Sequence, residues 1–323
     1  MNIAAQSHIR RRSLLTVAAA VALPAMAATW PERPIRLVVP FAAGGLGDIS
    51  ARLLAQSLST SLGTPVLVDN KPGANGIIGT DVVAKAAPDG YTLLMTVRSA
   101  QTFAPVVYKT PYDSVKDLTP ISILGDIDNI MIVHPSVKAN TVQELIALAK
   151  AEPGRMNYAA GTSLVHLAME VFKHLTGTSI VSVPYKGAGP ALEAVLKGEV
   201  AMTFDPFSAL PHLRAGKLKC LAVLSDRRST VLPDVPTLRE AGVSGLTLES
   251  WLGLMAPAGT PPDIIKRLHA AAVTMVQTPA VRERFAAMNV HPVGNTPEQF
   301  AQIVVSDTAR WAQYVKTLNF KAE

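Results

Sequence analysis

Short apolar runs alternate along this chain with segments of helical period, and glycines stand at the junctions between them. Residues 35–40 form a continuous apolar run, which is typical of a strand covered on both faces. Gly44, Gly45 and Gly47 follow, and a helical pattern then continues to Gly63, where a left-handed helix end is expected. Further strands are predicted at residues 66–68 and 91–97. The alternation predicts a doubly wound α/β unit.

A second unit of the same kind begins with a helix that Thr141 caps. Strands are predicted in it at residues 156–160, 180–184, 201–204 and 219–223. The long apolar stretches 121–134 and 246–257 fit neatly in neither unit, and we interpret both as crossovers. Two lobes with a cleft between them are therefore expected. The tail helices, around residues 264–276 and 297–318, are expected to pack on the first lobe.

The N-terminus has the three parts of a secretory signal peptide. Arg10, Arg11 and Arg12 precede an apolar run at residues 14–23, which is too short to cross a membrane as a helix. Ala25 and Ala27 form an Ala-x-Ala cleavage site, which predicts a signal peptide at residues 1–27 with cleavage after Ala27. Its removal leaves 27 basic and 24 acidic residues, so the mature net charge is only +3. An uncleaved anchor is the alternative.

Composition excludes several classes of function. The chain has one cysteine, so it forms no internal disulfide, and Cys220 lies in an apolar run that predicts a packed thiol. Aromatic residues make up 5% of the sequence and do not alternate with Lys and Arg, which argues against nucleic-acid binding. We therefore expect a globular protein that binds no nucleic acid, and the predicted signal peptide indicates export from the cytoplasm.

One glycine-containing turn in each lobe is a candidate anion site. A strand that ends in such a turn before a helix presents free backbone N–H groups and the positive end of the helix dipole. Two turns that face each other across a cleft could hold one carboxylate. The alternative is that the glycines only permit tight turns and that a hydroxyl caps the second helix. The candidate ligand-binding residues in these turns are Phe41, Gly44, Gly45, Gly161, Thr162 and Ser163.

Each of the charged residues near these turns has two possible roles. Asp48 either binds a polar group of the ligand or is a first-turn helix acid stabilised by the dipole. Asp205, at a strand end, lines the cleft or forms a turn. Arg98 either pairs with a second carboxylate of the ligand or lies solvated on the surface, and Ser99 next to it is a further candidate.

His166, Glu170 and His174 share one helix face, which raises the question of a metal site. The opposite face is apolar, so we interpret the stripe as a solvated side and predict no metal and no cofactor. His166 lies in the first helical turn and can still approach a bound solute. No Walker loop, His-Glu-x-x-His or Gly-x-Ser-x-Gly motif is present, so no catalytic residues are predicted. The rival hypothesis is an exported hydrolase that uses Asp48 or Asp205 with His166.

Several ordered segments resemble one family. They include Trp-Pro-Glu-Arg-Pro-Ile at 30–35, Asn-Lys-Pro-Gly-Ala-Asn-Gly at 70–76, Pro-Asp-Gly-Tyr at 88–91, Val-Pro-Tyr-Lys-Gly at 183–187 and Leu-Pro-Asp-Val-Pro-Thr at 232–237. The chain is similar in these to the Bug family, the extracytoplasmic receptors of tripartite tricarboxylate transporters. The resemblance covers essentially the whole mature chain. The chain departs from the family pattern at Ala42 and Ala43, where a proline is frequent, and at Arg98, where a small polar residue is frequent.

The resemblance implies an α/β, two-lobed periplasmic-binding-protein (Venus-flytrap) fold with two crossovers, type II-like. We predict lobe 1 from residues 28–125 plus 253–323 and lobe 2 from residues 126–252. It also implies a receptor that captures a small carboxylate or related solute, largely through backbone groups and water. A pairing of Arg98 with a second carboxylate would favour a dicarboxylate or an aromatic acid. A membrane transporter component is the implied partner, in uptake or in sensing, and the receptor is expected to be a monomer.

Overall fold

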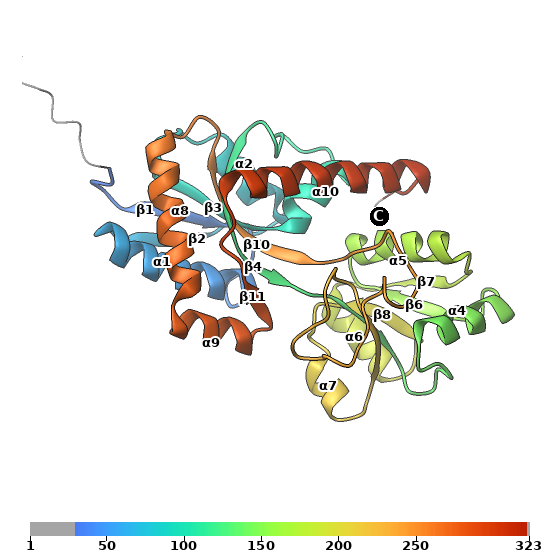
Figure 1. Cartoon of the computed structure of the whole chain (residues 1–323). Helices are drawn as coiled ribbons and strands as arrows, with labels where there is room; N and C mark the ends of the chain where they lie inside the picture. The colour runs from blue at the N-terminus through green and yellow to red at the C-terminus, as the bar shows by residue number, and fades with distance from the viewer. Residues whose placement is uncertain (1–29, 322–323) are drawn as a thin grey trace, which may run out of the picture.

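The computed structural model describes residues 30–321, so the predicted signal peptide at residues 1–27 and its cleavage site lie outside the described residues. Two mixed sheets, each with helices packed on it, form two lobes side by side (Figure 1). None of the helices within residues 30–321 is long and apolar enough to cross a membrane. The predicted two-lobed α/β fold is confirmed.

Lobe 1 contains a six-stranded sheet in the order β11-β4-β10-β3-β1-β2. Its strands are β1 (Ile35–Val39), β2 (Val66–Asn70), β3 (Thr92–Val97), β4 (Leu118–Ile127), β10 (Ser250–Pro257) and β11 (Val290–Pro292). Its helical elements are α1 (Leu46–Leu62), η1 (Ala74–Gly76), α2 (Ile77–Ala84), η2 (Ser99–Phe103), α3 (Ala104–Val107), α8 (Pro262–Gln277), α9 (Pro279–Ala287) and α10 (Pro297–Thr317).

The apolar run at 35–40 forms β1, which pairs in parallel with β2 on one side and β3 on the other. Its side chains Ile35 and Leu37 are fully buried, as expected for a strand covered on both faces. Helix α1 ends at Gly63 in the left-handed conformation, with φ of 67°, which glycine adopts without a steric penalty. The sequence prediction for this unit is confirmed.

Lobe 2 contains a five-stranded sheet in the order β7-β6-β8-β5-β9. Its strands are β5 (Ile130–Val133), β6 (Asn157–Ala160), β7 (Val181–Pro184), β8 (Met202–Asp205) and β9 (Lys219–Val223). Its helices are α4 (Val142–Ala151), α5 (Ser163–Thr176), α6 (Ala188–Leu196) and α7 (Leu210–Arg214). Thr141 caps α4 as predicted, because its side chain accepts a hydrogen bond from the amide of Glu144.

The two apolar stretches that fit neither unit are crossovers. The first forms β4 in the lobe 1 sheet and continues directly into β5 in the lobe 2 sheet, and the second returns the chain to lobe 1 as β10. The Asn129 side chain, between β4 and β5, donates a hydrogen bond to the Leu248 carbonyl at 2.5 Å, so the two crossovers are joined where they pass between the lobes. The predicted lobe boundaries, near residues 125 and 253, fall inside β4 and β10.

The C-terminal helix α10 differs from its prediction. Its first half packs on lobe 1 through Phe300 and Val304, as expected. Its second half extends over lobe 2, where Trp311 belongs to the same apolar core as residues of α5 (Figure 1). Beyond the helix, Phe320 packs edge-on against His166 of α5, with 5.1 Å between ring centroids. The expectation that the whole tail packs on lobe 1 is therefore wrong for the end of α10.

Candidate functional site

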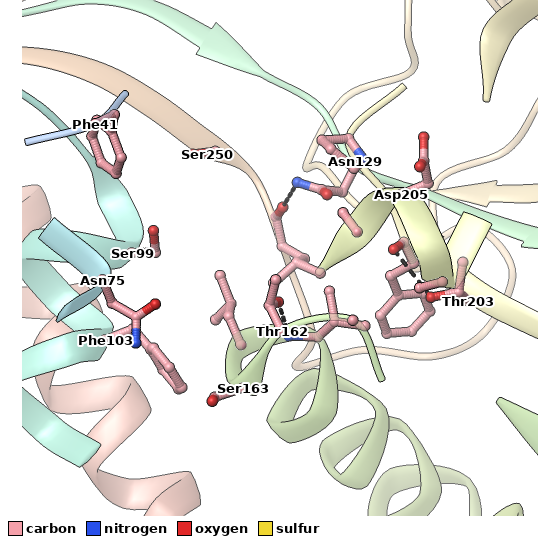
Figure 2. Close-up of a pocket in the computed structure, with 18 residues that line it drawn as sticks. Phe41, Asn75, Ser99, Phe103, Asn129, Thr162, Ser163, Thr203, Asp205 and Ser250 are labelled. Carbon is pink, nitrogen blue, oxygen red and sulfur yellow. Dashed lines mark hydrogen bonds between the residues drawn. The ribbon is translucent and has the colours of Figure 1, made fainter. Parts of the chain in front are cut away.

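A cavity of about 250 Å³ lies between the two lobes. Lobe 1 contributes Phe41, Asn75, Ser99 and Phe103, and the crossovers contribute Asn129, Leu248 and Ser250. Figure 2 shows the lobe 1 side chains opposite Thr162 and Ser163, across the space between the lobes. The lobe 2 wall comprises Gly161, Thr162, Ser163, Leu164, Val165, Ala188, Ala191, Thr203, Phe204, Asp205 and Pro206.

The turn from β6 into α5 is the polar part of the lobe 2 wall. Thr162 is the N-cap of α5, and its hydroxyl accepts a hydrogen bond from the Val165 amide at 3.2 Å. The amides of Ser163 and Leu164, in the first helical turn, have no acceptor within residues 30–321. These N–H groups and the positive end of the helix dipole lie at the cavity wall, which suits an anion.

Gly161 is required in this turn by close packing. A Cβ atom at this position would lie 2.7 Å from the Gly187 carbonyl oxygen and 2.9 Å from the Ala191 Cβ. The glycine therefore lets the β6–α5 turn approach the N-terminus of α6, whose Ala188 and Ala191 also line the cavity. The capping alternative and the anion-site prediction are compatible here, because Thr162 caps the helix while the next two amides remain without acceptors.

Ser163 also connects the lobes. Its hydroxyl lies 2.9 Å from the hydroxyl of Tyr108, which follows α3 in lobe 1. This hydrogen bond crosses the cleft beside the cavity. The relative position of the two lobes is therefore coupled to Ser163, the first residue of α5.

The corresponding turn in lobe 1 is closed by Asp48. This carboxylate is 3% exposed and accepts hydrogen bonds from the Gly44 amide, the Arg52 guanidinium and the Asn70 side chain, at 2.9, 3.0 and 3.0 Å. The bond from Arg52 is the largest cause that lowers the pKa of Asp48. Asp48 therefore remains ionised and fixes the turn, which favours the structural alternative. Of residues 41–48, only Phe41 lines the cavity, so Gly44, Gly45 and Asp48 do not.

Arg98 differs from both of its sequence interpretations. It is 8% exposed and makes two hydrogen bonds to the Asp307 carboxylate of α10, at 2.7 and 2.5 Å. A third bond, of 2.6 Å, joins it to the Glu249 carbonyl at the start of the second crossover. The prediction of a guanidinium free to bind ligand is corrected, and so is that of a solvated surface arginine. Ser99, the next residue, does line the cavity.

Asp205 lines the cavity but has partners of its own. Its carboxylate accepts hydrogen bonds from the Ser208 hydroxyl and the Ala209 amide, at 2.5 and 2.8 Å, which is the predicted turn-forming role. Burial raises the pKa of Asp205.

His166 does not line the cavity. Its ring packs between Tyr158 and Phe320, and its Nε2 lies 3.9 Å from Glu170. The polar face of α5 that contains His166, Glu170 and His174 is thus partly covered by the C-terminal segment and is less solvated than predicted. Within residues 30–321, no group of three His, Cys, Asp or Glu side chains could hold a metal. Cys220 is largely buried, and this burial raises its pKa to about 12, which suits a packed thiol.

Several residues that line the cavity were not predicted from the sequence. Asn75 belongs to the glycine-rich segment after β2, and this segment was the one signal that could have identified it. Phe103, Asn129, Leu248 and Ser250 come from elements that only the tertiary fold brings to the cleft. The other residues that were missed belong to α5, α6 and the end of β8.

Comparison with known proteins identifies the family. A family model described as tripartite tricarboxylate transporter family receptor matches residues 50–320. The chain belongs to this receptor family. The curated relative BugT of Bordetella pertussis is 42% identical, over 94% of each chain, so the resemblance to the Bug family is confirmed.

Solved structures agree with this assignment. One, an R. palustris protein with adipate, is 34% identical, covers 90% of this chain and 98% of its own, and has a TM-score of 0.76. Another, MatC from Rhodopseudomonas palustris with bound malate, is 32% identical, covers 88% and 99%, and has a TM-score of 0.73. Solved members of the family are periplasmic binding proteins. The chain is therefore a solute-binding receptor of the tripartite tricarboxylate type.

Proposed function

We propose that this receptor works in the periplasm and captures a small organic carboxylate in the interlobe cavity. The observation that carries the proposal is the start of α5, where the Ser163 and Leu164 amides lack acceptors and line a cavity closed by both lobes. Backbone donors at a helix N-terminus stabilise an anion without a neighbouring cation. The adipate and malate held by the two similar proteins support the same ligand class.

The predicted signal peptide supports export, and cleavage after Ala27 would release a mature chain into the periplasm. The proposed partner is the membrane component of a tripartite tricarboxylate transporter, or a sensor in its place. The receptor is proposed to act as a monomer. Contacts do not favour an exported hydrolase: Asp48 and Asp205 each hold a turn, and within the described part of the chain no hydrogen bond joins either of them to His166.

Calorimetric titration of the purified protein with mono-, di- and tricarboxylates tests the proposal. We expect 1:1 binding of at least one carboxylate, no binding of its amide analogue and no product after prolonged incubation. A ligand at 100 times its Kd would stabilise the fold by ~2.7 kcal/mol, which thermal unfolding measures. A complete absence of binding across the panel would overturn the proposal, and turnover would favour the hydrolase.

A pair of variants at Ser163 tests the role of the backbone amide. Ser163→Pro removes the N–H, and proline is tolerated here because Ser163 is the first residue of α5 and Thr162 before it is extended, with φ of −145° and ψ of 156°. Ser163→Ala removes only the hydroxyl. We expect affinity to fall about tenfold or more in the proline variant and only a few-fold in the alanine variant. Equal losses would contradict the assignment to the amide.

A further inference from the structure

A second space lies between the lobes, apart from the cavity. It has a volume of about 430 Å³, and we call it the rear hollow. Arg227, which follows β9, lines it from lobe 2, and lobe 1 contributes Arg282 of α9 with His291, Pro292 and Val293 at β11. None of these five residues lines the cavity.

The strand order of both sheets places the rear hollow behind the hinge. In lobe 1, the cavity lies at the ends of β1 and β3 and the rear hollow at β11, and the crossover strands β4 and β10 lie between them. In lobe 2, the cavity lies at the ends of β6 and β8 and the rear hollow beyond β9, with β5 between them. Because the chain passes between the lobes through β4, β5 and β10, the two spaces lie on opposite sides of the hinge. A hinge motion that narrows one of them therefore widens the other.

An ion pair joins the two lobes on the side of the rear hollow. The Arg227 Nη2 atom lies 3.7 Å from the Asp126 Oδ2 atom of β4, close enough for attraction but too far for a hydrogen bond. The backbone around Arg227 is fixed, because the Asp226 amide donates to the Glu249 carboxylate at 3.0 Å and the Ser225 hydroxyl donates to the Arg227 carbonyl at 2.7 Å. The arrangement of the lobes therefore sets the distance between the two charges.

The length of this pair fits a cleft that is closed in front. Here the lobes meet beside the cavity through the hydrogen bond between Tyr108 and Ser163, while the rear hollow is wide. Opening of the cleft would narrow the rear hollow and bring Arg227 closer to Asp126, where the attraction is stronger. Arg282 on the opposite wall is exposed, so solvent and salt screen its repulsion of Arg227. The ion pair is thus more favourable in the open arrangement and opposes closure.

We propose that the ion pair between Arg227 and Asp126 sets the affinity of this receptor from behind the hinge, so that its removal strengthens ligand binding. Neither residue lines the cavity. The apparent affinity depends on the fraction of molecules in the binding-competent arrangement, and a contact that favours the open cleft lowers this fraction without touching the ligand. The effect on affinity rests on the proposed function.

A matched pair of arginine variants tests the proposal by calorimetry. Arg228 follows Arg227 directly, but its guanidinium binds Glu240 within lobe 2. We expect Arg227→Met to bind adipate and malate about two- to fivefold more tightly than the unaltered protein, and Arg228→Met to bind them equally. Titrations at pH 8 keep Asp126 ionised, because burial and the nearby Glu249 raise its pKa to about 6. Unchanged or weaker binding in Arg227→Met would overturn the proposal.

Asp126→Asn removes the same attraction from the lobe 1 side. We expect a gain in affinity similar to that of Arg227→Met, and no further gain in the double variant, because both substitutions remove one interaction. Gains that add in the double variant would show that the two residues act separately and would contradict the proposal.

Small-angle X-ray scattering of the ligand-free proteins tests the hinge without any ligand. We expect a smaller radius of gyration for Arg227→Met and Asp126→Asn than for the unaltered protein and Arg228→Met, because the closed arrangement becomes more populated. Equal radii in all four proteins would overturn the proposal. If the radii differ as expected but no carboxylate of the wider panel binds, the proposed function fails while the role of the ion pair at the hinge stands.

Discussion

The two glycine-containing turns at the cleft look alike in sequence and differ in structure. In lobe 2, Gly161 brings the turn against α6, and the next amides remain without acceptors at the cavity wall. In lobe 1, Asp48 takes the Gly44 amide and ties the turn to Arg52 and Asn70. Asp48 makes the lobe 1 turn a structural corner, and the amides at the start of α1, which has no side-chain cap, belong to residues that do not line the cavity. Arg98 is likewise held within the protein, by Asp307 of α10.

This contrast predicts that polar residues of the lobe 1 side act on stability and those of the lobe 2 turn act on binding. The largest effect is expected from Arg98→Ala, which removes two hydrogen bonds to the buried Asp307 and leaves Arg310, at 3.1 Å, as its remaining ionic partner. We expect the free energy of unfolding to fall by ~2–4 kcal/mol in urea titrations, with ligand affinity of the folded protein unchanged. The double variant Arg98→Met/Asp307→Leu should recover only part of the loss, because Arg310 then lacks its carboxylate. A variant of normal stability with weakened binding would reverse the contrast.

The second-largest effect is expected from alanine substitution of one glycine in each turn. Gly161→Ala places a methyl group 2.7 Å from the Gly187 carbonyl, which should cost ~1–3 kcal/mol and shift the amides out of position, so binding should also weaken. Gly45→Ala is the control: its Cβ would lie 3.7 Å from the nearest atom, at a φ of −79° that alanine adopts freely. Thermal unfolding and calorimetry on both variants measure the difference. Similar behaviour of the two would show that the turns are equivalent after all.

Asp48→Asn tests the structural corner through pH. The folded pKa of Asp48 lies below its ordinary value, so its carboxylate contributes stability that is present above the unfolded pKa and is lost as the pH falls through the folded one. Near neutral pH we expect the variant to be less stable by ~1–2 kcal/mol. As the pH falls below about 4, the gap between the two unfolding midpoints should narrow, and it should close below the folded pKa. A gap that does not narrow between about pH 6 and about pH 2.5 would mean that the charge of Asp48 is not what stabilises the turn.

The smallest effect is expected at the hydrogen bond between the lobes. Tyr108→Phe removes the partner of the Ser163 hydroxyl, so this arrangement of the lobes loses ~1 kcal/mol or less and affinity should fall by a few-fold at most. Tyr112→Phe is the control, because the buried Tyr112 hydroxyl has no hydrogen-bond partner within residues 30–321. Calorimetry on both variants makes the comparison, and equal losses would assign no role to the contact across the cleft.

Local patterns explain what the sequence predicted well. The apolar run of β1, the Gly63 helix end and the Thr141 cap depend on neighbours within a few residues, and all three are confirmed. The β6–α5 turn was found for the same reason. That this turn lines a cavity also depends on lobe 1, which no local pattern reports.

Contacts between distant residues explain what the sequence did not reveal. Arg98 finds Asp307 209 positions further along the chain, and no local pattern reports such a pairing. Phe103 and Leu248 reach the cavity from opposite halves of the chain. The fold was therefore predictable to the level of lobes and crossovers, whereas the state of each charged side chain depended on partners that only the tertiary structure supplies.

Helix α10 adds a third strut to the two crossovers. It is anchored to lobe 1 near Arg98, and its far end rests on lobe 2 through Trp311 and Phe320. The two crossover strands alone would allow the lobes to twist as well as bend relative to each other. Helix α10, fixed to lobe 1 and packed on α5 of lobe 2, resists the twist. We therefore expect the lobes to open by a hinge motion about α10, with the largest displacement at the side of the cleft farthest from this helix.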